Sequence, residues 1–108
     1  MNPSIFEIQA QFCKVMGNAA RLEILHALRQ HPMNVGELAN ETGFGQPLVS
    51  RHLGTLRNAG VVKCERNGNE MHYQLMDEKI GEVCDMVRTV LFKQADRHTQ
   101  VILAAEDD

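Results

Sequence analysis

The most constraining feature of the sequence is a long, one-sided apolar stripe in its last third. At 100° per residue, its members fall within an arc of about 120° and span about six helical turns. They are Ile80, Val83, Cys84, Val87, Val90, Leu91, His98, Val101 and Ile102. The stripe predicts a helix over residues 78–103. A chain of 108 residues forms one domain, with a body too small to cover such a helix, so we expect it to pair with another long helix.

The beginning of the chain predicts a second helix with an unusually wide apolar surface. Two apolar stripes lie side by side on residues 4–16. One contains Ile5, Ile8, Phe12, Val15 and Met16, and the other contains Phe6, Ala10 and Cys13. So wide an arc indicates a helix that is covered on two sides. In a small protein, one side faces the core and the other faces a second subunit.

Three shorter helices are expected between these two. Residues 19–30 are strong helix formers, and Pro32 ends the segment. Asn34 and Glu37 form a capping-box pattern at the start of the next helix, which ends at Gly43. Residues 46–58 form the following helix. The apolar residues at core spacing are Leu22, Leu25, Leu28, Val35, Leu38, Ala39, Leu48, Val49, Leu53 and Leu56.

After the helices, the apolar period switches from 3.6 to two. Residues 61–66 and 71–75 read as strands around Asn67-Gly68-Asn69, and Asn-Gly between strands favours a hairpin. The fold class is therefore mainly α with a small β-hairpin. Two short helices over 34–59 make a helix-turn-helix, and the hairpin over 61–76 adds a wing.

The charge is distributed unevenly along the chain. The whole protein carries a net charge of −3, yet residues 45–66 carry +3, while 1–44 carry −1 and 67–108 carry −5. Because the local field decides where a polyanion docks, the cationic middle segment indicates double-stranded DNA as a partner.

The predicted helix 46–58 has the size and surface of a helix that enters the major groove. Gln46, Ser50 and Arg51 are candidates to read bases, with His52 near the edge of the same surface. The remaining candidates are expected to contact phosphates or the minor groove. They are Arg57, Lys63, Arg66, Asn67 and Asn69.

Residues 12–76 resemble the ArsR/SmtB family of bacterial transcriptional repressors. The motifs are N-x-x-R-L-x-I-L from Asn18, V-G-E-L from Val35, S-x-H-L-x-x-L from Ser50, A-G-V-V from Ala59 and Y-x-L from Tyr73. The resemblance implies a homodimer joined through residues 1–16 and 78–103. It also implies a winged helix-turn-helix repressor that binds an operator and releases it on sensing a metal or a reactive species.

The sensor sites of that family are not found in this sequence. The helix that would carry its thiolate metal site reads NVGELANET, without cysteine, and Lys79 and Val90 stand at two positions of its other zinc site. The V-G-E-L motif resembles that of the persulfide- and redox-sensing branch of the family. However, His26 stands where that branch has its first cysteine, and the end of the last helix has none. We therefore expect no metal site of either kind.

Three cysteines remain as candidates for an inducer site. Cys13 and Cys84 lie on the two helices expected at the dimer contact, and Cys64 lies in the wing. They are candidates for binding As(III) or another thiophilic ligand, or for oxidation by reactive sulfur or oxygen species. Alternatively, the three thiols only pack, since free cysteine is among the most buried residue types.

Other function classes find little support in the sequence. There is no nucleophile–base pair and no Gly-rich phosphate loop, so the chain is not expected to be an enzyme. Neither a membrane-spanning run nor a secretory signal is visible, which predicts a cytoplasmic protein without membrane contact. Two alternatives stay open: a winged-helix module that binds protein, and an ArsR-type regulator without cysteine-based sensing.

Overall fold

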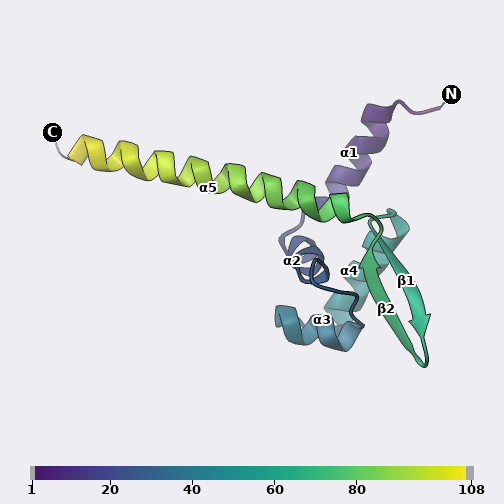
Figure 1. The fold of residues 1–108 in the computed structure, drawn as a ribbon. Coiled ribbons are helices and arrows are strands. Elements are labelled where there is room, and N and C mark those ends of the chain that lie inside the picture. The colour runs from purple at the N-terminus through teal and green to yellow at the C-terminus, as the bar shows by residue number, and fades with distance from the viewer. Residues whose placement is uncertain (1, 107–108) are drawn as a thin grey trace.

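A computed structural model describes residues 2–106, and Figure 1 shows their arrangement. The elements are α1 (Ile5–Met16), α2 (Ala19–Leu28), α3 (Val35–Thr42), α4 (Gln46–Asn58), β1 (Val62–Asn67), β2 (Glu70–Leu75) and α5 (Glu78–Glu106). The expected fold class, mainly helical with one antiparallel hairpin, is confirmed. The side chains of Val101 and Ile102, two members of the predicted stripe, lie outside the described residues.

The core is built where α2, α3 and α4 meet the base of the hairpin. Of the four residues of α4 predicted at core spacing, Val49, Leu53 and Leu56 are fully buried and Leu48 is half-buried. The buried residues are Ile24, Leu25, Ala27, Leu28, Met33, Leu38, Val49, Leu53, Leu56, Val61 and Val62. One face of α4 is thus fixed by the core, and the opposite face is left for solvent.

The hairpin begins one residue later than the sequence predicted. Val61 precedes β1 because its amide donates to the Leu56 carbonyl, at 2.9 Å, and its own carbonyl accepts from Met76. At the tip, Gly68 has a φ of 68°, which glycine adopts without strain. Met33 and Tyr73 exchange two backbone hydrogen bonds of 3.0 and 2.8 Å, which join the base of the hairpin to the chain before α3.

Two helix ends differ from the predicted boundaries. The second helix was expected to reach residue 30, but α2 ends at Leu28, and the Arg29 and Gln30 amides bond to carbonyls three residues back. Such tightening at a last turn is common, and Pro32 prevents the helix from resuming. The last helix was expected to end near 103 and continues to Glu106.

Helices α1 and α5 contact this body over only part of their length, through Phe12, Val15 and Met16 of α1 and Ile80 of α5. In Figure 1, α1 projects to one side, and the later turns of α5 extend clear of every other described element. No residue of α1 is buried, and Phe6, Met86 and Phe92 are each at least two-thirds exposed. The radius of gyration is 17.6 Å, against about 13 Å for a compact domain of this length. The chain therefore leaves much of its apolar surface uncovered.

A cluster of charged side chains joins α5 to α2. Arg29 extends across Gly81 of α5, where a Cβ atom would overlap its side chain, and donates to the Asp85 carboxylate at 2.8 Å. Arg88 also donates to Asp85, and its Nη2 lies 3.3 Å from His26 Nδ1. The hydrogen bond from Arg29 is the main reason why the pKa of Asp85 is held below its usual range.

The Asp85 cluster predicts a pH-dependent contribution to stability. Replacing Asp85 by Asn should lower the melting temperature at pH 7, because the carboxylate is stabilised more in the folded state than in the unfolded chain. Because the pKa of Asp85 is lower in the folded protein than in the unfolded chain, its carboxylate contributes fully to folding stability above the unfolded pKa of about 4. This contribution is lost as the pH falls through the folded pKa.

Melting curves of the wild type and Asp85→Asn between pH 2 and 8 test this expectation. The gap between the two proteins should be constant above about pH 5 and shrink below it. Asp96→Asn, an exposed position on the same helix, is the control. A gap that widens on acidification would contradict the assignment.

Candidate nucleic-acid interface

The turn between α3 and α4 fixes the orientation of α4 relative to α3. Asn34 caps α3 reciprocally with Glu37, as the sequence predicted. At the other end, Gly43 adopts the left-handed conformation with a φ of 81°, which ends the helix and turns the chain toward α4. The Thr42 hydroxyl donates to the Leu38 carbonyl at 2.7 Å and accepts from the Phe44 amide at 3.3 Å. The turn is thus short and hydrogen-bonded.

The solvent face of α4 carries most of the predicted DNA-contacting residues of this helix. Gln46, Ser50, Arg51 and Arg57 are all exposed, whereas Val49, Leu53 and Leu56 of the same helix are buried in the core. Together they present a polar surface with two cations and no carboxylate. Such a surface offers donors to phosphates, and Gln and Arg can pair with adenine and guanine edges.

His52 occupies a different position from the other predicted residues of α4. Its side chain is half-buried on the flank of the helix rather than on the exposed face. Burial lowers the pKa of His52, and the positive charges of Arg21 and Arg51 lower it further. His52 is therefore neutral at pH 7 in the free protein.

The wing carries the remaining predicted residues. Arg66, Asn67 and Asn69 are exposed at the tip of the hairpin, which lies beside α4 (Figure 1). Lys63 lies nearer the base of the hairpin and is half-buried. The fold therefore gathers a polar, cationic set of side chains from α4 and from the wing, two elements that are separate in the sequence.

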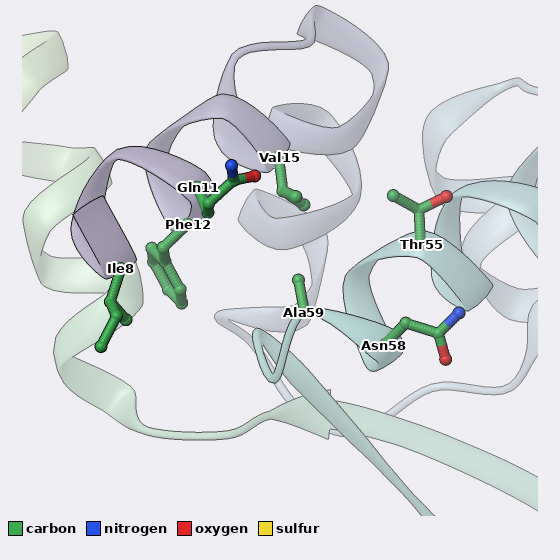
Figure 2. Close-up of a pocket in the computed structure, with 7 residues that line it drawn as sticks. All are labelled: Ile8, Gln11, Phe12, Val15, Thr55, Asn58 and Ala59. Atoms are coloured by element: carbon green, nitrogen blue, oxygen red, sulfur yellow. The ribbon is translucent and has the colours of Figure 1, made fainter. Parts of the chain in front are cut away.

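Among the apolar grooves that flank α1, one lies beside the end of α4 and another is lined by two of the cysteines. Figure 2 shows the first, in which Ile8, Phe12 and Val15 of α1 stand across from the end of α4. It has a volume of about 570 Å³, and its other lining residues are Gln11, Thr55, Asn58 and Ala59. The second, the α1–α5 groove, measures about 310 Å³. It is lined by Phe12, Cys13, Met16, Gly17, Leu22, Val83, Cys84, Val87, Arg88 and Leu91.

The α1–α5 groove brings together two of the three cysteines. Cys13 is exposed and Cys84 is half-buried, and burial raises the pKa of the Cys84 thiol. Cys64 is not among the groove residues. It lies on β1 opposite Tyr73, whose ring packs on the core and whose pKa burial raises. Cys64 thus belongs to the wing, whereas Cys13 and Cys84 line one groove from two different helices.

Two polar contacts of Glu70 were not predicted from the sequence. Asn34 was recognised as a cap, but it also donates to Glu70 of β2 at 3.3 Å. His72 is half-buried, and its Nε2 lies 3.1 Å from the Glu70 carboxylate. An alternating strand pattern gives no signal for a partner on a distant element.

No helix between residues 2 and 106 is long and apolar enough to cross a membrane. Within the same part of the chain, no group of three or more His, Cys, Asp or Glu side chains is arranged to hold a metal ion.

Comparisons with known proteins agree with this geometry. The family described as "Bacterial regulatory protein, arsR family" matches residues 18–63. The HTH-type transcriptional regulator Rv0081 of Mycobacterium tuberculosis is 36% identical over 88 residues, which cover 81% of this chain and 77% of that protein. The biofilm growth-associated repressor of Xylella fastidiosa is 32% identical over 85 residues, 79% of this chain and 75% of the repressor.

Solved structures give the same result. The crystal structure of M. tuberculosis Rv0081 superposes with a TM-score of 0.79 at 32% identity and covers 91% of this chain and 99% of that one. A winged helix-turn-helix domain from Mycobacterium bovis, described as homodimeric, gives 0.74 at 26% identity and covers 86% and 91%.

The fold, the exposed cationic face of α4 and the relatives together identify the protein as a winged helix-turn-helix transcriptional regulator. This is a class of DNA-binding proteins rather than of enzymes. Within that class, the chain belongs to the ArsR family.

Proposed function

We propose that the protein is a homodimeric repressor that binds a two-fold symmetric operator and releases it when a thiol-reactive inducer binds between α1 and α5. In this proposal, residues 34–59 and 61–76 contact DNA, and residues 1–16 and 78–103 join the subunits. The observation that supports DNA binding is the exposed, cationic face of α4. The protein acts where the operator lies, in the bacterial cytoplasm.

The uncovered apolar surface of α1 and α5 supports the dimer. Ile5, Phe6, Val87, Leu91 and Phe92 are all more than half exposed. Apolar surface of this extent is uncommon on a monomer and is typical of an interface between subunits. A symmetric pair would present two copies of α4, which fit successive major grooves when they stand about 34 Å apart.

The contacts divide into those that read sequence and those that hold the backbone. We assign Gln46, Ser50 and Arg51 to bases, and His52 to the edge of the same surface. We assign the others to phosphates or the minor groove because a wing tip and a helix end approach the backbone first. These are Arg57, Lys63, Arg66, Asn67 and Asn69.

Replacing Arg51 by Ala should therefore weaken specific binding more than non-specific binding. On a duplex that the wild-type protein selects from a random-sequence pool, we expect a loss of about 1–3 kcal/mol, with a much smaller loss on scrambled DNA. Arg66→Ala should weaken both duplexes alike and reduce the salt dependence of binding. Fluorescence anisotropy titrations at several salt concentrations measure all of these quantities.

The two variants control for each other, since each removes one arginine from the same surface. Equal losses on the selected and scrambled duplexes for both variants would refute the division of contacts. Wild-type affinity that does not depend on salt would refute DNA binding through this cationic surface.

The α1–α5 groove supports the sensing part of the proposal. Its two thiols, Cys13 and Cys84, lie between the helices that we assign to the dimer interface, so a ligand bound there alters that interface. Soft metalloids such as As(III) prefer thiolate ligands. Because the raised pKa of Cys84 keeps its thiol protonated at pH 7, we expect the response to strengthen as the pH rises. Cys64, in the wing, is a third candidate ligand.

Substitution of the cysteines tests this part. The Cys13→Ser/Cys84→Ser variant should bind the selected duplex with wild-type affinity and should no longer release it on addition of arsenite, a persulfide or hydrogen peroxide. Cys64→Ser is the matched control and should respond like the wild type if the groove is the site. Release that persists after all three cysteines are replaced would show that sensing does not use thiols.

A further inference from the structure

The α3 cap and the wing share one side chain. The Oδ1 atom of Asn34 accepts from the Glu37 amide at 2.8 Å, which caps α3. Its Nδ2 donates to the Glu70 carboxylate at 3.3 Å, across 36 residues of sequence. The same residue therefore caps the start of the first helix of the helix-turn-helix and holds the first residue of β2.

Glu70 is held on a second side within the wing. His72 Nε2 lies 3.1 Å from the same carboxylate oxygen, Oε2, and the two hydrogen bonds keep the pKa of Glu70 below its usual range. Glu70 is thus ionised at neutral pH. In the hairpin register it stands directly opposite Asn67, next to the two-residue turn.

The wing is consequently attached at two points. The backbone bonds between Met33 and Tyr73 hold its base, and the Asn34–Glu70 link holds the end near its tip. A two-stranded hairpin is marginal without support, so a second attachment determines the direction in which the tip points. This tip carries Arg66, Asn67 and Asn69.

We propose that Glu70 is a positioning residue for DNA binding, which acts through Asn34 to fix the wing tip relative to α3 and α4. The inference rests on the proposed function, because it assigns a task to the wing in that function. It also accounts for a carboxylate on a surface that meets a polyanion. Coulomb repulsion alone would make an acidic side chain unfavourable there.

The test exchanges the donor and acceptor of the link without removing the cap. Asn34→Asp keeps the α3 cap, since Asp caps helices as well as Asn does, and places a second carboxylate against Glu70. Adding Glu70→Gln restores a hydrogen bond, with Gln now the donor. Adding Glu65→Gln instead gives the same net charge, but Glu65 is exposed on β1 and forms no hydrogen bond with Asn34 in the described structure.

Two readouts separate this inference from DNA binding itself. In the free protein, amide hydrogen exchange across residues 66–72 should rise about tenfold in Asn34→Asp, while α3 amides stay protected. Affinity for the selected duplex should fall about fivefold. The Asn34→Asp/Glu70→Gln pair should recover both values, and the Asn34→Asp/Glu65→Gln pair should not.

Three results would overturn the inference. They are unchanged wing exchange in Asn34→Asp, no recovery with Glu70→Gln, and equal recovery with Glu65→Gln, which would reduce the effect to net charge. If the wild type bound no duplex, the proposed function would fail, while the exchange measurements would still decide whether the link orders the wing.

Discussion

The constraint on which the rest of the molecule depends is that the exposed apolar surface of α1 and α5 must be covered. A 12-residue helix without a single buried residue is marginal in water by itself, and α1 is such a helix. On α5, residues such as Val90 and Phe92 are exposed on a rod that runs clear of the body (Figure 1). In the proposed dimer a second copy covers both helices, and that same contact sets the distance between the two copies of α4.

The interface and the DNA-binding surface are connected through a short path of packed elements. Arg29 joins α2 to Asp85 of α5, and α2 contributes Ile24 and Leu25 to the core that also holds α4. A ligand in the α1–α5 groove would act at the start of this path. A differential binding energy of a few kcal/mol between two dimer geometries suffices to shift operator affinity by two orders of magnitude or more.

The wing contributes to the same surface by a different route. Its base is fixed by backbone hydrogen bonds at Tyr73, and its tip is held through the side chain of Glu70. The helix-turn-helix and the wing therefore move as one unit if the inferred link holds. Binding then depends mainly on how the two subunits are placed.

Local signals in the sequence were sufficient to predict the order of helices and strands and the buried face of α4. The capping box at Asn34 and the turn at Gly68 depend only on neighbouring residues, so they were predictable. The Asn34–Glu70 and Arg29–Asp85 contacts join residues 36 and 56 positions apart, and they arise from packing angles that no periodicity encodes.

Sedimentation equilibrium of the full chain at micromolar concentrations, without DNA, tests the central claim most directly. The account predicts that the wild type has twice the mass of one chain. It also predicts that Leu91→Glu, which places a charge on the exposed apolar side of α5, has the mass of a single folded chain. A wild-type protein that is monomeric at these concentrations, or a Leu91→Glu variant that dimerises equally well, would contradict it.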